Sequence, residues 1–366
     1  MGLNCGIVGL PNVGKSTIFN ALTRAGAEVA NYPFCTINPN VGVVEVPDER
    51  LDTLARMMQP SKVTPTNMQF VDIAGLVKGA STGEGLGNQF LGHIREVNAI
   101  AHVVRCFDDP DVVVSNSTTL DPGQDIDIIH TELILSDLQN LEKRLYKQQK
   151  AAKSGDEKER QTLTTCSKIK IGLEKGIPAR QLSLSAEETV ILNELQLMTG
   201  KPVLYVLNVG EDPSPKEQQH IQTVTELAQK EKAGVVRING KLEAELNELE
   251  PEERKAFLAE LGLQTSGLEN LIQASYSLLN LITFFTGAAR CELRAWTIKQ
   301  GTKFPQAAGT IHTDFERGFI RGEVIHYEDY VKVGSEAAAR DKGMLHVEGK
   351  EYVVQDGDIV HIRFNV

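Results

Sequence analysis

The sequence predicts an α/β fold of the P-loop type with a doubly wound, mostly parallel sheet. Residues 9–17 match the pattern G-x-x-x-x-G-K-[ST] and lie between a short apolar run and a helix-forming run. In that setting the backbone N–H groups of the loop form a cradle for phosphate. Residues 68–73 form a second apolar run, and residues 72–75 match D-x-x-G. Apolar runs at 100–107 and 202–207 continue the series of buried strands.

Length and composition set outer limits on the function. A chain of 366 residues is too long for one ordinary core, so two or three domains are expected. With 41% hydrophobic and 24% charged residues, no membrane-length apolar run and no export signal, we expect a cytoplasmic protein without a membrane partner. The five scattered cysteines include no C-x-x-C pair, which suggests neither a zinc site nor a disulfide framework. A net charge of −11 argues against a surface that binds nucleic acid all over.

The loop at residues 9–17 predicts a nucleotide phosphate site. Gly9 and Gly14 let the backbone turn so that its N–H groups and the next helix N-terminus point at an anion. Lys15 is expected to reach the β- and γ-phosphates, and the Ser16 hydroxyl to bind Mg²⁺. The alternative is a glycine turn that precedes a lysine by chance, which the flanking strand and helix disfavour.

Two further segments fit the same site. Thr36 lies in a loop before the strand at 41–46, where a threonine can give Mg²⁺ a second hydroxyl and sense the γ-phosphate, although a lone loop threonine is usually a turn residue. Asp72 ends its strand and would hold Mg²⁺ through water, while the Gly75 N–H would meet the γ-phosphate. Leu76 follows, where many Ras-like GTPases have a glutamine that orients the attacking water, so slow intrinsic turnover is expected.

Two histidines near these segments have weaker claims to a catalytic role. His102 lies inside the apolar run at 100–107 and is interpreted as a core histidine. His93 follows the glycine-rich segment and is a weak candidate for positioning water.

Residues 108–201 are far longer than a simple crossover between strands requires. One apolar stripe comprises Ile134, Leu138, Leu141 and Leu145, and a second comprises Leu184, Ile191, Leu195 and Met198. Two amphipathic helices separated by a lysine-rich tip at 143–175 predict an antiparallel helical hairpin, inserted at about residues 125–200. Residues 140–180 contain eleven Lys or Arg and five Asp or Glu. This basic segment could contact RNA locally or could be a solvated helix face, and the sequence favours neither interpretation.

The segment after the strand at 202–207 concerns base selection. Guanine-specific domains have N-K-x-D there, whereas this chain has Asn208-Val209-Gly210-Glu211. The longer Glu211 side chain displaces the bidentate contact that an aspartate makes with guanine. Loss of guanine preference is the first inference, and use of ATP is the second.

The composition changes near residue 281, which predicts a nucleotide-binding domain at 1–280 and a small α+β domain at 281–366. Residues 242–263 and 267–281 are expected to form acidic helices. In the second domain we expect a strand at 292–298, a helix at 307–319, closing strands at 352–354 and 360–364, and a hairpin turn at Asp356-Gly357.

These motifs together resemble the YchF family of Obg-like ribosome-binding ATPases, and the match runs nearly end to end. The matching segments are residues 9–17, 31–36, 72–80, 83–91, 208–211, 294–297, 305–309, 311–320 and 364–366. The resemblance implies an Obg-type nucleotide domain, a coiled-coil insert and a C-terminal TGS domain of β-grasp shape. It also implies that the chain binds ATP and Mg²⁺. The implied partners are the ribosome, with the large subunit as the expected binding site, and ribosomal RNA or translation factors.

The resemblance also assigns roles by position. The phosphates fall to Asn12, Val13, Gly14, Lys15, Ser16 and Thr17, Mg²⁺ to Ser16, Thr36 and Asp72, adenine to Asn208 and Val209, and catalysis to Lys15, Thr36 and Gly75. Asn12 also matches an asparagine that some relatives use to coordinate K⁺. Some members have a histidine, proposed to aid hydrolysis, where residues 108–115 have none.

The expected function is hydrolysis of ATP to ADP and phosphate by a nucleotide switch that acts in translation or stress regulation. A GTPase in ribosome assembly or translation is the first alternative. A weakly hydrolysing, nucleotide-gated adaptor is the second.

Overall fold

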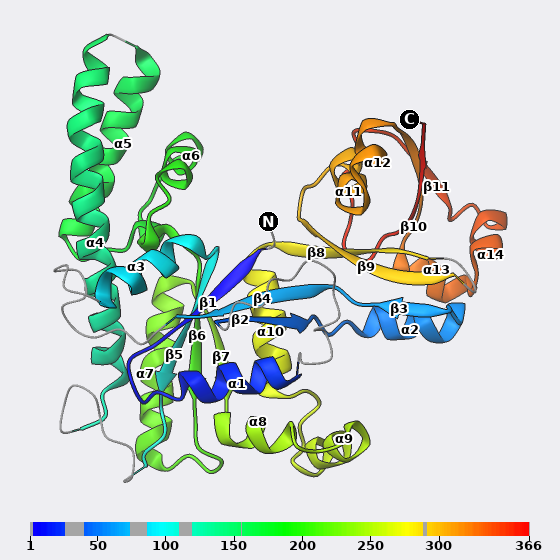
Figure 1. Cartoon of the computed structure of the whole chain (residues 1–366), viewed down its shortest axis with the longest axis horizontal. Helices are drawn as coiled ribbons and strands as arrows, with labels where there is room; N and C mark the ends of the chain where they lie inside the picture. The colour runs from blue at the N-terminus through cyan, green and yellow to red at the C-terminus, as the bar shows by residue number, and fades with distance from the viewer. Residues whose placement is uncertain are drawn as a thin grey trace. The chain divides into compact units, whose positions relative to one another are not determined.

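The computed structural model describes residues 3–25, 40–73, 86–109, 119–154, 156–287 and 291–365 (Figure 1). The chain forms two compact units. The first comprises Met1–Gly42 and Gln69–Ser275, and the second comprises Val43–Met68 and Tyr276–Val366.

The first unit is built on a six-stranded sheet in the order β2-β4-β1-β5-β6-β7. Its strands are β1 Asn4–Val8, β2 Val41–Glu45, β4 Asn67–Asp72, β5 Ala99–Arg105, β6 Val203–Asn208 and β7 Gly234–Ile238. The pairings of β1 with β4 and β5, of β5 with β6, and of β6 with β7 are parallel. Every residue of β5 and β6 is buried, which is why both appear in the sequence as continuous apolar runs. The predicted α/β fold with a mostly parallel sheet is therefore confirmed.

The helices that accompany this sheet are α1 Lys15–Ala25, α3 Leu86–Glu96, α7 Pro215–Glu231, α8 Gly240–Leu246, α9 Pro251–Glu260 and α10 Gly267–Leu278. Their starts follow from local chemistry. Ser214 and Glu217 form a capping box at α7, with Pro215 at its first position, and the Asn239 side chain accepts two backbone N–H groups at α8.

A helical arm leaves this unit between β5 and β6 (Figure 1). It consists of α4 Pro122–Ala151, a 3₁₀ turn at Ala152–Ser154 and α5 Glu157–Glu174, and the two helices pack antiparallel. Asp121 and Asp156 cap the two helices through their side chains. The chain returns through short helices: η4 Ala179–Gln181, α6 Ala186–Leu195 and η5 Met198–Gly200.

The arm corrects one expectation. The predicted tip at 143–175 is mostly helical, because it contains the C-terminal end of α4 and all of α5. The second stripe at 184–198 forms α6 and η5 instead of the returning arm helix. Lys, Arg, Glu and Gln favour helix, and Cys166, Ile169 and Leu173 extend the apolar core of the arm through this segment. The charged residues of 143–175 therefore lie mostly on exposed faces of helices and not in a loop.

The second unit is built on a sheet in the order β11-β10-β12-β8-β9-β3. Its strands are β3 Lys62–Thr64, β8 Leu281–Thr286, β9 Glu292–Lys299, β10 Phe319–Ile325, β11 His346–Glu348 and β12 Ile359–Phe364. β12 pairs parallel with β8, whereas β8 with β9, β10 with β11 and β10 with β12 are antiparallel. The helices are α2 Glu49–Met58, α11 Phe304–Ile311, α12 Thr313–Arg317, α13 Tyr327–Val333 and α14 Glu336–Asp341.

Two apolar clusters hold this unit together. One places Phe304 of α11 against Phe284 and Val324 of the sheet. The other contains Leu51, Leu54 and Met58 of α2 together with Phe285, Leu293 and Ile325. Because α2 and β3 belong to residues 43–68, the compact units differ from the predicted division at 280/281. A pairing between β3 and β9 is invisible in a sequence that separates them by more than 200 residues.

Three details of the C-terminal prediction are wrong. The expected helix at 307–319 is two short helices, and a strand, β10, begins at Phe319. Residues 352–354 contribute only an isolated bridge between Val353 and Lys303, so no hairpin forms at Asp356-Gly357. Gly357 does adopt a positive φ of 89°, while the Asp356 carboxylate accepts the Thr283 N–H and pairs with Arg50.

Within the described part of the chain, no helix is both long enough and apolar enough to cross a membrane. The four described cysteines are free, and Cys5, Cys106 and Cys166 are buried while Cys291 is exposed. Burial raises the pKa of Cys5 and Cys106 to about 12, so these thiols remain protonated packing groups.

Candidate nucleotide site

The loop between β1 and α1 has the backbone shape of an anion cradle. Asn12 and Gly14 have positive φ values of 65° and 90°. A Cβ at Gly14 would lie 2.1 Å from the Asn208 Nδ2 atom, so glycine is required both for the turn and for the close approach. Helix α1 begins at Lys15 directly after the loop, so its first N–H groups face the space that the loop surrounds.

Lys15 and Asp72 meet at this edge of the sheet. The Lys15 ammonium forms a short ion pair with the Asp72 carboxylate, and Lys15 is buried. The parallel pairing of β1 with β4 places Ile7 beside Asp72, which brings the strand end to the start of the loop. Ser16, in the first turn of α1, is exposed. A hydroxyl and a carboxylate oxygen are the hard ligands that Mg²⁺ prefers, so the residues present fit that ion.

Asn208, at the end of β6, braces the loop. Its buried Nδ2 donates to the Val13 carbonyl at 3.0 Å, and its Oδ1 accepts the Gly240 N–H at 3.1 Å. One side chain therefore connects the phosphate loop, the carboxyl end of β6 and the start of α8. Both polar atoms of the amide therefore take part in positioning these three segments.

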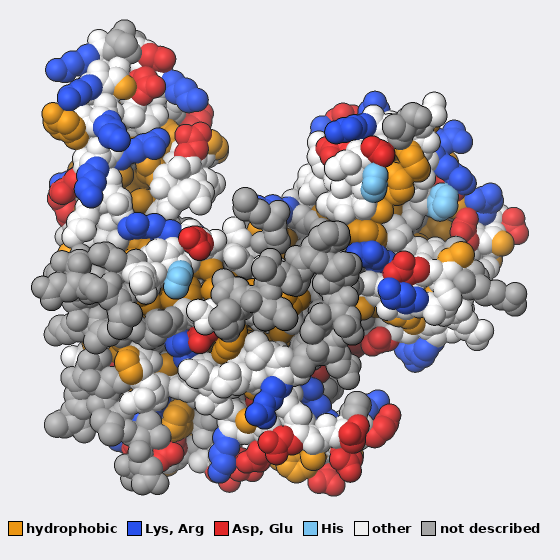
Figure 2. All heavy atoms as spheres, in the orientation of Figure 1, with side chains coloured by type: hydrophobic (Ala, Val, Ile, Leu, Met, Phe, Trp, Pro, Cys, Tyr) orange, Lys and Arg blue, Asp and Glu red, His pale blue; other side chains and the backbone are white. Residues whose placement is uncertain are grey.

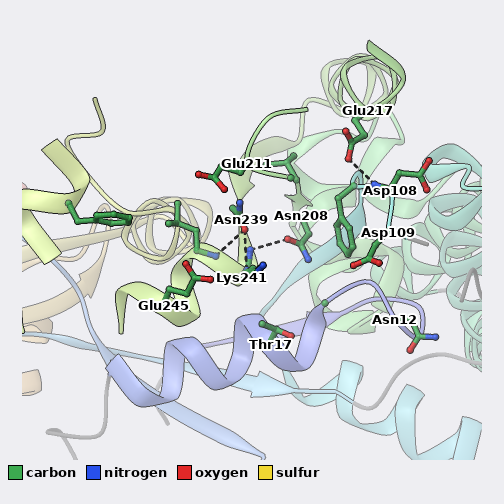
Figure 3. Close-up of a pocket in the computed structure, with 17 residues that line it drawn as sticks. Asn12, Thr17, Asp108, Asp109, Asn208, Glu211, Glu217, Asn239, Lys241 and Glu245 are labelled. Carbon is green, nitrogen blue, oxygen red and sulfur yellow. Dashed lines mark hydrogen bonds between the residues drawn. The ribbon is translucent and has the colours of Figure 1, made fainter. Parts of the chain in front are cut away.

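A cavity of about 620 Å³ opens beside the brace (Figure 3). Thr17 on α1 lies on one side of it, and Asn239 and Lys241 lie across from it. The lining residues come from the phosphate loop with α1 (Asn12, Gly14, Thr17), the segment after β5 (Phe107, Asp108, Asp109), the end of β6 (Asn208, Val209, Gly210, Glu211), and α7 to α9 (Glu217, Asn239, Gly240, Lys241, Leu242, Glu245, Phe257). The size suits a small organic ligand, and the position at the carboxyl ends of parallel strands suits a nucleotide.

The wall formed by the segment after β5 is fixed by charge and hydrogen bonds. The Asp108 N–H donates to Glu217 Oε1 at 2.8 Å, and Lys216 pairs with the Asp108 carboxylate at 3.0 Å. The hydrogen bond from Lys216 lowers the pKa of Asp108. Burial raises the pKa of Glu217, but the N–H groups of Asp108 and Ser214 outweigh it and lower that pKa overall. Both carboxylates are therefore ionised at neutral pH.

The structure brings most of the predicted site residues together. Asn12, Gly14, Thr17, Asn208 and Val209 line one cavity. Lys15 contacts Asp72 beside it, and the buried Val13 contributes its carbonyl to the brace. Thr36 and Gly75 lie outside the described residues, as does Leu76.

Sequence reasoning missed several residues of the cavity wall. Phe107, Asn239 and Lys241 were not singled out as ligand contacts. A signal was available for one of them, because the pair Asn239-Gly240 follows directly after β7 at the start of α8. Asn239 caps that helix through its side chain and so orients Gly240 toward Asn208.

The structure places His102 in the core, as interpreted, and His93 on the surface. His102 is buried in β5 beside His130 and Tyr205, and burial lowers its pKa to about 3. It is therefore a neutral core residue at physiological pH. His93 is an exposed residue of α3.

Two family models match the chain. Residues 4–132 match the model described as "50S ribosome-binding GTPase", and residues 281–365 match YchF-GTPase_C, described as a protein of unknown function. The first match covers the phosphate loop and Asp72, and the second covers the C-terminal strands.

Relatives of known name match over the full length. The chain is 53% identical to "Ribosome-binding ATPase YchF" of Bacillus subtilis strain 168 and 51% identical to the protein of that name from Escherichia coli O157:H7, in each case over 100% of both chains. A solved structure described as "Structure of the Schizosaccharomyces pombe YchF GTPase" matches with a TM-score of 0.88 and 38% identity, and the match covers 99% of this chain and 98% of that one.

Proposed function

The chain belongs to the YchF family, and from that premise we propose that it is a ribosome-associated, Mg²⁺-dependent triphosphatase that hydrolyses ATP to ADP and phosphate. The observation that supports this best is the cavity in which phosphate-loop residues and Asn208-Val209-Gly210-Glu211 line a common wall. The bacterial relatives are named ribosome-binding ATPases. The alternative of a GTPase has support from the fission yeast relative, which is named a GTPase.

The proposed chemistry is in-line attack by water on the γ-phosphate, in which the protein contributes positioning and charge. Lys15 stabilises negative charge on the phosphates, and the N–H groups of the loop bind their oxygens. Ser16, Thr36 and Asp72 hold Mg²⁺, which neutralises phosphate charge when it is bound. The Gly75 N–H senses the γ-phosphate. With Leu76 unable to orient water, intrinsic turnover is slow, and Asn12 is the proposed ligand for K⁺.

The proposed preference for ATP rests on the base end of the cavity. Adenine has neither the N1–H nor the 2-amino group that an aspartate at position 211 would bind in guanine. The amide of Asn208 is occupied by Val13 and Gly240, so we assign it the role of shaping the adenine site instead of reading the base edge. Val209 then offers its side chain and backbone beside the ring.

Base preference is tested by competition between unlabelled ATP and GTP for a fluorescent ATP analogue, with Mg²⁺ present. We expect ATP to compete clearly better. The double variant Val209→Lys, Glu211→Asp restores N-K-x-D and is expected to gain affinity for GTP, while Glu245→Asp serves as a carboxylate control in the same cavity. Preference of the unaltered chain for GTP would overturn the assignment and favour the GTPase alternative.

We also propose the domain names and partners that the resemblance implies. The parallel pairing of β12 with β8, between two antiparallel pairs, supports a β-grasp TGS domain in the second unit. The antiparallel α4 and α5 support a coiled-coil insert. The proposed location is the cytoplasm. There the chain binds the ribosome, with the large subunit as the proposed binding site, and acts as a switch in translation or stress regulation.

The adaptor alternative has a separate test. In the proposed switch, Lys15→Ala weakens ATP binding and removes the effect of ATP on co-sedimentation with ribosomes. If ATP never changes ribosome binding, and Lys15→Ala leaves it unaltered, the chain is a nucleotide-independent scaffold.

A further inference from the structure

One face of the helical arm combines cations with an exposed aromatic ring. Lys143, Tyr146, Lys147 and Lys150 lie on α4 at spacings of i, i+3, i+4 and i+7, which places them on one stripe of the helix. We call this set the α4 stripe. Leu141 and Leu145, by contrast, are buried in the core of the arm. Figure 2 shows Lys and Arg side chains at the upper end of the arm, interspersed with Asp and Glu.

Tyr146 is unusual for a surface residue. It is 63% exposed, and the Lys150 ammonium lies 4.3 Å from the centre of its ring. A cation over one ring face orients the side chain on the helix surface.

The charges of the two arm helices are arranged differently. Within the described chain, Lys143, Lys147 and Lys150 form no ion pair with an acidic side chain. On α5, Lys168 pairs with Glu188 at 2.7 Å, and Lys170 lies 3.5 Å from Glu142. The α5 side is therefore partly neutralised, whereas the α4 stripe remains cationic.

We propose that the α4 stripe binds RNA, with Tyr146 stacked on an unpaired base and the three lysines on the neighbouring phosphates. Unstacked bases in loops and bulges bind exposed aromatic rings, and lysines that follow the backbone supply most of the affinity. An acidic protein would use the lysines but leave the ring without a partner. This proposal deepens the proposed ribosome association, on which it rests for its biological setting.

The first test uses the full chain and a fluorescein-labelled 12-nucleotide single-stranded RNA. Tyr146→Leu is expected to weaken binding roughly 5- to 100-fold, because stacking on one base is worth about that factor. Tyr146→Phe keeps the ring and is expected to bind like the unaltered chain. Thermal melting of each variant checks that the arm remains folded.

The lysines are tested by salt dependence. Changing Lys143, Lys147 and Lys150 to Gln is expected to reduce the slope of log affinity against log salt by about 2, at roughly 0.7 for each phosphate contact. The matched control changes Lys158, Lys168 and Lys170 on α5 to Gln, which removes the same charge from the other helix. It is expected to change the slope by less than about 0.7.

Stacking has a direct spectroscopic readout. The chain contains one tryptophan, Trp296, in the second unit. In Tyr146→Trp, emission from the new indole is expected to be quenched by single-stranded RNA, while emission from the unaltered chain stays constant.

Several results would overturn the proposal. RNA affinity unchanged by Tyr146→Leu, or an unquenched indole under saturating RNA, would remove the stacking contact. Equal binding to polyglutamate or to anionic phosphatidylserine vesicles would show a surface that binds any polyanion. Failure of the unaltered chain to co-sediment with ribosomes would defeat the proposed function, whereas the oligonucleotide titrations would still decide whether the α4 stripe binds RNA.

Discussion

For Asn208, the sequence predicts a place at the base end of the nucleotide site, because the residue follows an apolar strand. The structure adds contacts that the sequence does not show. The two hydrogen bonds of Asn208 to Val13 and Gly240 depend on the tertiary fold and have no sequence signal. Lys15, Ser16 and Asp72 were easier to predict, because strand ends and a glycine loop place them through local chain geometry.

The bracing role of Asn208 predicts how substitution affects different ligands. Asn208→Ala leaves the Val13 carbonyl and the Gly240 N–H without their partner, so we expect a loss of about 1–3 kcal/mol in stability. Because the brace shapes the phosphate loop, affinity for inorganic tripolyphosphate is expected to fall together with affinity for ATP. Isothermal titration with both ligands measures this. A loss confined to ATP would instead assign Asn208 to direct contact with the base.

The buried histidines predict a pH dependence of stability. Burial lowers the pKa of His102 and His130 to about 3, against about 6.5 in an unfolded chain. Below pH 6.5 the unfolded state binds protons that the folded state excludes, so stability falls with pH until the folded histidines also protonate near pH 3. Each contributes up to about 1.4 kcal/mol per pH unit.

The double variant His102→Leu, His130→Gln checks this dependence. The glutamine side chain keeps an acceptor for the Arg180 and Tyr205 groups that lie within hydrogen-bond distance of His130 Nε2. Urea unfolding between pH 6.5 and 5 is expected to show a smaller loss of stability in this variant. Equal slopes for both proteins would mean that groups other than these two histidines govern the loss of stability in acid.

At the scale of elements, the base of the arm is held by a buried carboxylate. Asp137 of α4 accepts the N–H groups of Met198 and Thr199 at 3.1 and 2.8 Å, and the Thr199 hydroxyl at 2.7 Å. These three bonds attach η5, just before β6, to α4. Burial raises the pKa of Asp137, although its donors oppose the shift.

Asp137→Ala is therefore expected to lower the free energy of unfolding by about 2–4 kcal/mol, because buried donors lose their acceptor. Asp137→Asn keeps one acceptor oxygen and is expected to lose less. Urea titration followed by circular dichroism measures both. Exposed Asp127→Ala on the same helix is the control, and an equal loss there would show that α4 is sensitive to any such change.

The elements themselves were predicted unevenly. The buried strands of the first unit were visible because a parallel sheet gives continuous apolar runs. Strand β8 was missed because only the two-residue turn Leu279-Asn280 separates it from α10, so the apolar pattern of the helix runs almost without a break into the strand. The extent of α4 and α5 was also missed, since lysine-rich helix and lysine-rich loop look alike in composition.

At the scale of the molecule, the second unit depends on a segment from far earlier in the chain. Leu51, Leu54 and Met58 are all at most 5% exposed and pack on Phe285 and Leu293. Burial of three such side chains is worth about 5–9 kcal/mol, which is comparable with the whole stability of a domain. The division at 280/281, drawn from composition alone, does not include them.

Residues 276–366 expressed alone are therefore expected to melt without cooperativity and to bind a hydrophobic dye. A single chain that joins residues 43–68 to 276–366 is expected to restore a cooperative transition. The same fusion with Leu51, Leu54 and Met58 changed to Ser is the control. A cooperative melt of 276–366 by itself would mean that α2 and β3 contribute little.

The placement of α2 also has a consequence in time. A ribosome makes Glu49–Met58 more than 200 residues before the strand Leu281–Thr286 on which that helix packs. At about 5–20 residues per second, the interval is roughly 10–40 s. For that period the nascent helix has an apolar face without its native partner, and a strand made much later completes the fold of an early segment. The helix is therefore a target for a chaperone early in translation, and truncation before Leu281 would leave it without that partner.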